Sequence, residues 1–92
     1  MALIFHLPSQ ITHKNIEAVL ADGLVAINAC ETNGCLTVGC ESLESFDSSA
    51  LSAILSMKRH ARQKNISIVL QSIPEKLASL AKVYGVADVV LV

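Results

Sequence analysis

Aromatic residues are scarce in this chain, whose 92 residues include one Tyr, two Phe and no Trp. Hydrophobic residues nevertheless make up 52% of it, so we expect a core built from Leu, Ile, Val and Ala side chains. Charged residues are few as well, at 16%, and the formal net charge is −1. Nucleic-acid binding, which needs a strongly basic surface, is therefore not expected, and neither is a disordered charged tail.

Long apolar runs are also missing. No stretch approaches the roughly 18 consecutive apolar residues that predict a membrane-spanning helix, so direct membrane insertion is not expected. Residues 1–8 lack the basic segment and the long apolar segment of a signal peptide. We therefore expect a cytoplasmic protein, and the length corresponds to a single domain over residues 1–92.

Side chains suited to catalysis or metal binding are not grouped in recognisable motifs. Cys30, Cys35 and Cys40 are odd in number and include no C-x-x-C pair, so we expect reduced thiols that pack as small hydrophobic residues. The three histidines are scattered, and no glycine-rich phosphate loop is present. We predict no catalytic residue, no metal and no cofactor. An enzyme stays open as an alternative only through a nucleophilic Cys35 or Cys40.

Hydrophobic periodicity predicts an α/β fold in which helices pack on a mixed sheet of about four strands. Helical spacing of apolar residues covers Lys14–Asn28, Ser49–Lys64 and Glu75–Tyr84. Gly23 lies within the first pattern and could end that helix, but we favour a continuous one. The strands are expected at Leu3–Leu7, Cys35–Gly39, Ile66–Leu70 and Asp88–Val92.

The nearly all-apolar segment at residues 66–70 predicts a strand covered on both faces. The apolar faces of the helices and of this strand predict a buried set consisting of Leu51, Ile54, Leu55, Ile68, Leu77 and Leu80.

The most informative segment is Phe46–Leu51, where an extended stretch meets the central helix. One interpretation is a helix cap, because Asp and Ser oxygens accept hydrogen bonds from the amides of a first helical turn. The other interpretation is a binding surface that carries two hydroxyls, Ser48 and Ser49. A phosphate on Ser49 would be favoured by the positive end of the helix and opposed by Asp47.

Four cations crowd the C-terminal end of the same helix: Lys58, Arg59, Arg62 and Lys64. Cations suit the negative end of a helix, so the cluster is first interpreted as a solvated helix end. A contact surface for an acidic partner is the second interpretation.

The segment Asp47–Leu51, the basic helix end and the strand Ile66–Leu70 together resemble a STAS domain, and residues 73–86 are similar to that family's third helix and exit. Two branches of the family fit. One is the STAS subunit of Mla-type phospholipid ABC transporters, which binds the transporter's cytoplasmic ATPase; the short N-terminal region resembles this branch. The other is the anti-sigma-factor antagonist, whose partner is an anti-sigma factor kinase and which the Ser48-Ser49 pair resembles.

The resemblance implies a non-catalytic protein that binds an ABC transporter ATPase subunit and supports phospholipid transport in outer-membrane lipid asymmetry. It would be held at the inner membrane through that partner. The alternative is an anti-sigma-factor antagonist regulated by phosphorylation at Ser49. The chain departs from the common pattern at Ala50, where Gly is frequent. The predicted partner-binding residues are Ser45, Asp47, Ser48, Ser49 and Ser52.

Overall fold

The computed structural model describes residues 3–90. Along the chain, strands alternate with helices, and each long helix follows one or two strands. Three strands form a parallel sheet in the order β1 (Leu3–His6), β3 (Cys35–Gly39) and β5 (Ser67–Gln71). A second, two-stranded parallel pair joins β2 (Gln10–Ile11) to β4 (Ser45–Phe46). The α/β class is confirmed, and all strand pairs in this part of the chain are parallel, three strands in one sheet and two in the other.

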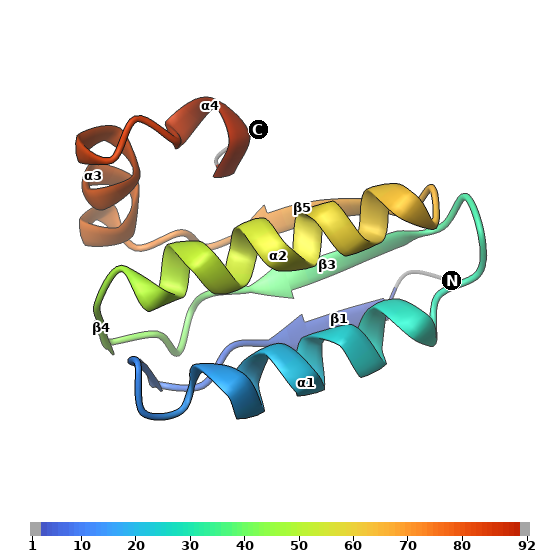
Figure 1. The fold of residues 1–92 in the computed structure, drawn as a ribbon, viewed down its shortest axis with the longest axis horizontal. Helices are drawn as coiled ribbons and strands as arrows, with labels where there is room; N and C mark the ends of the chain where they lie inside the picture. Colours follow the sequence, from blue (N-terminus) through green and yellow to red (C-terminus); the bar gives the residue numbers. More distant parts are fainter. Residues whose placement is uncertain (1–2, 91–92) are drawn as a thin grey trace.

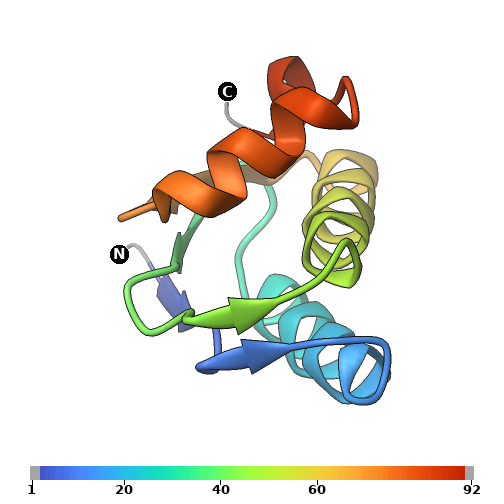
Figure 2. The same ribbon diagram turned by 90° about the vertical axis from the view of Figure 1, so that its left-hand side faces the viewer.

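Two long helices cover one face of the three-stranded sheet. Helix α1 (Ile16–Asn28) and helix α2 (Ser49–Gln63) lie side by side along the strands, as Figures 1 and 2 show. Helix α3 (Glu75–Val83) and the short α4 (Ala87–Val90) lie beyond the β5 edge, where α4 contacts both α2 and α3. The three longer helices were predicted to within two residues at each end.

Close packing of α1 on α2 depends on Gly23, which is buried within a continuous α1 as predicted. A Cβ atom at this position would lie 2.8 Å from Sδ of Met57 on α2. The glycine therefore lets the Met57 side chain approach the backbone of α1. This close packing offsets the low helix propensity of Gly23.

Within residues 3–90, the sheet is covered on one face only, which corrects the expectation for residues 66–70. Leu36 and Val38 of the central strand are buried against the helices, while burial along β5 alternates with every residue. On the opposite face, Ile4 is 56% exposed and Val69 is 50% exposed, and Thr37 lies between them in the register. The predicted apolar run was thus a one-sided strand whose outer residue, Val69, faces outward.

The predicted buried set is confirmed at Leu51, Ile54 and Leu77, which are 4%, 2% and 0% exposed. The other three members lie at the margin of the core and are partly buried: Leu55, Ile68 and Leu80.

The predicted strand at Asp88–Val92 is wrong over its described residues, because 87–90 form helix α4. Gly85 has φ +71° and ends α3 in the left-handed region, which turns the chain back toward α2. The carbonyl of Val86 then accepts hydrogen bonds from the amides of Val89 and Val90, and Val90 is fully buried. Residues 91 and 92 lie outside the described residues.

Candidate partner-binding site

The start of α2 is held in place by the β2–β4 pair. Ser45 and Phe46 pair with Gln10 and Ile11, and the amide of Asp47 donates a 3.2 Å hydrogen bond to the carbonyl of Ile11. Phe46 is partly buried against the core, which anchors the segment from below. The backbone on both sides of Asp47 is therefore fixed by a strand and by a helix.

Asp47 is the residue that caps α2. Its carboxylate accepts a 2.8 Å hydrogen bond from the amide of Ser49 and a 3.3 Å hydrogen bond from the amide of His13. The His13 ring also lies close, with Nδ1 3.6 Å from the same carboxylate. These hydrogen bonds, from Ser49 first and from His13 second, hold the pKa of Asp47 below its ordinary value.

The two serines after Asp47 differ in exposure. Ser48 is exposed and its hydroxyl makes no capping hydrogen bond, whereas Ser49 is partly buried. Ser45 and Ser52 are exposed on either side. The structure thus brings the five predicted residues together in one surface stretch of small polar side chains.

The first-turn amides of α2 are less available to a partner than the sequence suggests. The Ser49 amide bonds to the Asp47 carboxylate, and the Ala50 amide bonds to the Asp47 carbonyl at 3.1 Å. A partner at this site would therefore meet the serine hydroxyls, above all that of Ser48, and not these two amides. The helix-cap interpretation is therefore met by Asp47 alone. The hydroxyls of Ser45, Ser48 and Ser52 take no part in the cap and can contact a partner.

Two neighbouring features were not predicted from the sequence. His13 reaches Asp47 from the loop before α1, and a separation of 34 residues gives no local signal for that contact. A hollow of about 360 Å³ also adjoins the site between β4 and α3, lined by Glu44, Ser45, Phe46, Lys76 and Leu80. Its walls come from segments that only the tertiary fold brings together.

Lowering the pH is expected to weaken the Asp47 cap. Because the pKa of Asp47 is lowered in the folded state, the carboxylate stabilises the fold above the ordinary pKa of about 4, and this contribution is lost as the pH falls through the lowered value. We expect an NMR titration of the Asp47 carboxyl to give a midpoint below 3.8, the reference value for an aspartate. In Asp47→Asn the acid limb of the stability profile should be shallower than in the wild type. A midpoint at or above the reference would contradict the hydrogen bonds described.

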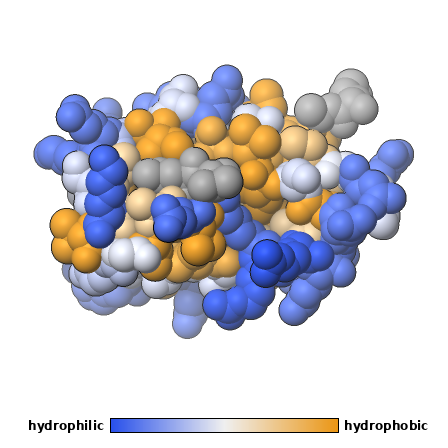
Figure 3. Space-filling model, turned by 90° about the horizontal axis from the view of Figure 1, so that it is seen from above, coloured by the Kyte–Doolittle hydropathy of each residue, from blue (hydrophilic) through white to orange (hydrophobic). Residues whose placement is uncertain are grey.

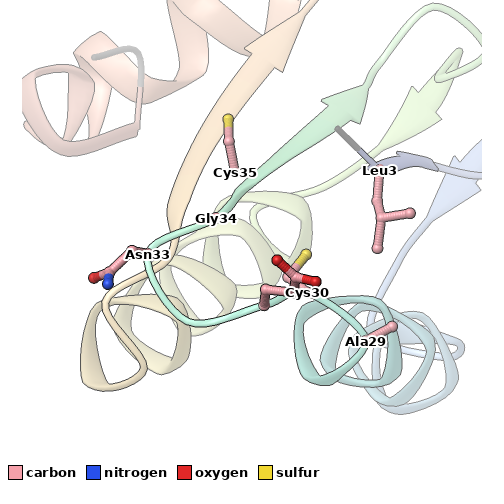
Figure 4. A pocket seen from close by; sticks show the side chains of 7 residues that line it. Leu3, Ala29, Cys30, Asn33, Gly34 and Cys35 are labelled. Atoms are coloured by element: carbon pink, nitrogen blue, oxygen red, sulfur yellow. The ribbon is translucent and has the colours of Figure 1, made fainter. Parts of the chain in front are cut away.

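The three cysteines lie in two different surroundings. Cys40 is fully buried, and burial first, then the charge of Glu41, raises its pKa to about 11. Cys30 and Cys35 line a hollow of about 460 Å³ beside Leu3 and Gly34 (Figure 4). The Cys30 thiol donates a hydrogen bond to the carbonyl of Ala26 in its own helix, and no histidine lines the hollow.

We expect Cys40 to resist a thiol-specific reagent in the native protein near pH 8, because its thiol is both buried and protonated. Cys30 and Cys35, which are partly exposed, should react first. Counting modified thiols by mass spectrometry, before and after unfolding in urea, checks the order. Rapid native labelling of Cys40 would contradict this packing and would favour the enzyme alternative.

Each histidine has a side-chain partner, and the three pairs lie apart. Nδ1 of His6 lies 2.6 Å from the Glu41 carboxylate, and Nε2 of His60 lies 3.3 Å from Oδ1 of Asn28. The Glu41 pKa is lowered by a hydrogen bond from its own amide first and by His6 second. Among residues 3–90, no group of three His, Cys, Asp or Glu side chains could hold a metal ion.

The arrangement of these elements is a known fold. The fold is similar to that of a solved structure described as the anti-sigma factor antagonist SpoIIAA in its unphosphorylated form, with a TM-score of 0.73 and 18% identity. That similarity covers 95% of this chain and 75% of the other. Comparison with curated proteins gives no match.

The chain belongs to the STAS family described as "Mlab, STAS domain", whose sequence model matches residues 2–92. The resemblance noted from Asp47–Leu51 and the following elements is thereby confirmed and extended over nearly the whole chain. Within residues 3–90, no helix is both long and apolar enough to cross a membrane.

Proposed function

We propose that this protein is a non-catalytic STAS subunit that binds and supports the cytoplasmic ATPase of an Mla-type phospholipid ABC transporter, and so acts in outer-membrane lipid asymmetry. The observation that carries the proposal is the exposed serine surface at the start of α2, present in a chain of the Mlab-type STAS family. The protein would be cytoplasmic and held at the inner membrane through this partner.

The serine surface suits close contact with another protein. The side chains of Ser45, Ser48 and Ser52 are short, so a partner backbone can approach, and each hydroxyl both donates and accepts hydrogen bonds. Asp47 fixes the backbone beneath them through its hydrogen bonds to Ser49 and His13. A surface that is ordered before binding loses little conformational entropy when the partner docks.

A binding role also agrees with the contacts at this surface. Among residues 3–90, no hydrogen bond joins the hydroxyl of Ser48 or Ser52 to a histidine, and His13 contacts the carboxylate of Asp47. STAS domains are generally non-catalytic binding domains, which supports a role through contact.

Co-expression with the cognate Mla-type ATPase subunit tests the proposal. We expect the two proteins to co-purify at a fixed stoichiometry and the ATPase activity of the transporter to fall when this subunit is left out. An ATPase subunit from an unrelated ABC importer serves as the control and should not be retained. Failure to bind the cognate ATPase, with the STAS protein shown to be folded, would overturn the proposal.

The second candidate is an anti-sigma-factor antagonist switched by phosphorylation of Ser49, with an anti-sigma factor kinase as partner. The specific observation in its favour is the position of Ser49, a partly exposed hydroxyl residue at the start of a long helix. A phosphate there would carry up to two negative charges beside the Asp47 carboxylate, which already occupies the Ser49 amide. Intact-mass measurement on protein from its native cell, followed by fragmentation to locate any phosphate, distinguishes the two, because a phosphorylated fraction on Ser49 favours this candidate.

A further inference from the structure

A groove of about 490 Å³ lies between the C-terminal half of α2, strand β5 and helix α4. Its apolar wall is formed by Leu55, Ile68 and Val89, and Val89 is 54% exposed. Figure 3, which views the molecule from above, shows apolar atoms in its middle part and hydrophilic side chains toward its edges. The groove is separate from the serine surface, because it lies toward the other end of α2.

The rim of this groove is charged, and among the described residues that line it most charges are positive: Lys58, Arg59 and Arg62 against Asp88. Arg59 and Arg62 are exposed and form no ion pair with any of residues 3–90. Partial burial lowers the pKa of Lys58, so the exposed guanidinium groups of Arg59 and Arg62 carry the argument for this rim. The chain as a whole carries a net charge of −1, which makes this positive rim a local feature.

The combination of charges and apolar wall selects a class of ligand. Guanidinium groups pair with carboxylates through two parallel hydrogen bonds, so Arg59 and Arg62 favour acidic side chains. The apolar wall requires an apolar side chain between those acids. Asp88 opposes a continuous row of phosphates and accommodates one basic side chain, which disfavours a nucleic acid or an anionic membrane.

We propose that this groove docks an acidic amphipathic segment of a protein partner. Leucine-like side chains of the segment pack on Leu55, Ile68 and Val89, and glutamate or aspartate side chains pair with Arg59 and Arg62. This inference goes beyond the proposed function, because the groove contributes a second contact surface whatever protein binds at Ser48.

A synthetic peptide tests the groove without any knowledge of the partner. The probe is a blocked peptide of about four helical turns, with Leu at i, i+4 and i+7 and Glu at the flanking positions, the pattern of helix-in-groove recognition. The matched control has Gln at every Glu. In NMR titrations of the full chain, the Glu peptide is expected to shift the amides of Arg59, Arg62 and Val89 and to leave Ser48 unmoved, while the Gln peptide binds more weakly.

Charge-reversal variants connect the binding to the rim. Arg59→Glu with Arg62→Glu is expected to weaken binding of the Glu peptide roughly tenfold or more. Lys14→Glu with Lys82→Glu introduces the same change of charge at exposed sites elsewhere and should have little effect. Asp88→Asn is expected to tighten binding of the Glu peptide about two- to fivefold, because one repelling charge is removed. An unfolded variant would bind the peptide more weakly, so tighter binding by Asp88→Asn cannot result from a loss of the fold.

Several outcomes would overturn the proposal. They are equal binding of the Glu and Gln peptides, binding that persists in the double Arg variant, or shifts that map to the start of α2. Binding of the chain to anionic phospholipid vesicles through Arg59 and Arg62, without binding of the peptide, would assign the groove to a membrane surface. Self-association that the double Arg variant abolishes in sedimentation equilibrium would assign it to a second copy of this chain. The peptide titrations contain no ATPase, so a negative result in them does not bear on the proposed function. That function is tested separately by co-expression with the ATPase subunit.

Discussion

Replacing Ser48 by arginine is expected to abolish binding to the cognate ABC ATPase and to leave the melting temperature nearly unchanged. Ser48 is exposed and has φ −62° and ψ −14°, which arginine adopts without strain. The long cation would occupy the space that a partner backbone needs, and it would lie unfavourably at the positive end of α2. Disrupting a contact at the centre of an interface is expected to lower the affinity for the ATPase on the order of a hundredfold or more.

Pull-down with the ATPase and a thermal melt of each protein measure the two halves of this prediction. Ser67→Arg is the matched control, because Ser67 is also an exposed serine but begins β5, far along the sheet from the start of α2. This control should bind as the wild type does. If folded Ser48→Arg also binds at the wild-type level, the ATPase interface lies elsewhere on the domain.

Truncation of Ile54 to alanine is expected to reduce the free energy of unfolding by about 2–5 kcal/mol. Ile54 is 2% exposed and lies midway along α2, where it belongs to the cluster that joins the helices to the sheet. Removing three carbon atoms there loses their burial and leaves a cavity that rigid neighbours cannot fill completely. For a domain of this size the loss is a large fraction of the total stability.

Urea unfolding followed by circular dichroism measures the effect, with Val25→Ala as the control. Val25 also carries a β-branched side chain on a helix, but it is 68% exposed on the outer side of α1. Its truncation should change the free energy of unfolding by less than about 0.5 kcal/mol. Similar effects at the two positions would show that the packing face of α2 is wrongly assigned.

The helices could be predicted from the sequence because their signals are local. Apolar residues recur every three or four positions in each, and the ends coincide with Pro74, Gly85 and the serines after Asp47. The hydrogen bonds of a helix also close within a few residues, so short-range patterns contain most of the information needed. The continuity of α1 through Gly23 was predicted, but its reason, the approach of Met57, lies in another helix.

Sheet faces and the C-terminal element were harder to predict, because apolar composition does not distinguish a one-sided strand from a two-sided one. Val69 is as apolar as its neighbours Ile68 and Leu70, yet it lies on the uncovered face. Residues 88–90 have strand-like composition, but Val90 is buried by a short helix against α2 and α3. Tertiary packing overrode β propensity at this point.

By itself, the sequence determined the α/β class, the three long helices and the position of Asp47 and the serines at the start of α2. These depend on periodicity and on capping chemistry, which act over a few residues. Only the tertiary structure decided that His13 supports Asp47, that the Ser49 amide is already occupied, and that cations and apolar side chains from α2, β5 and α4 line one groove. The physical reason is that each of these arrangements joins residues far apart in the chain, whose meeting depends on how the helices pack on the sheet.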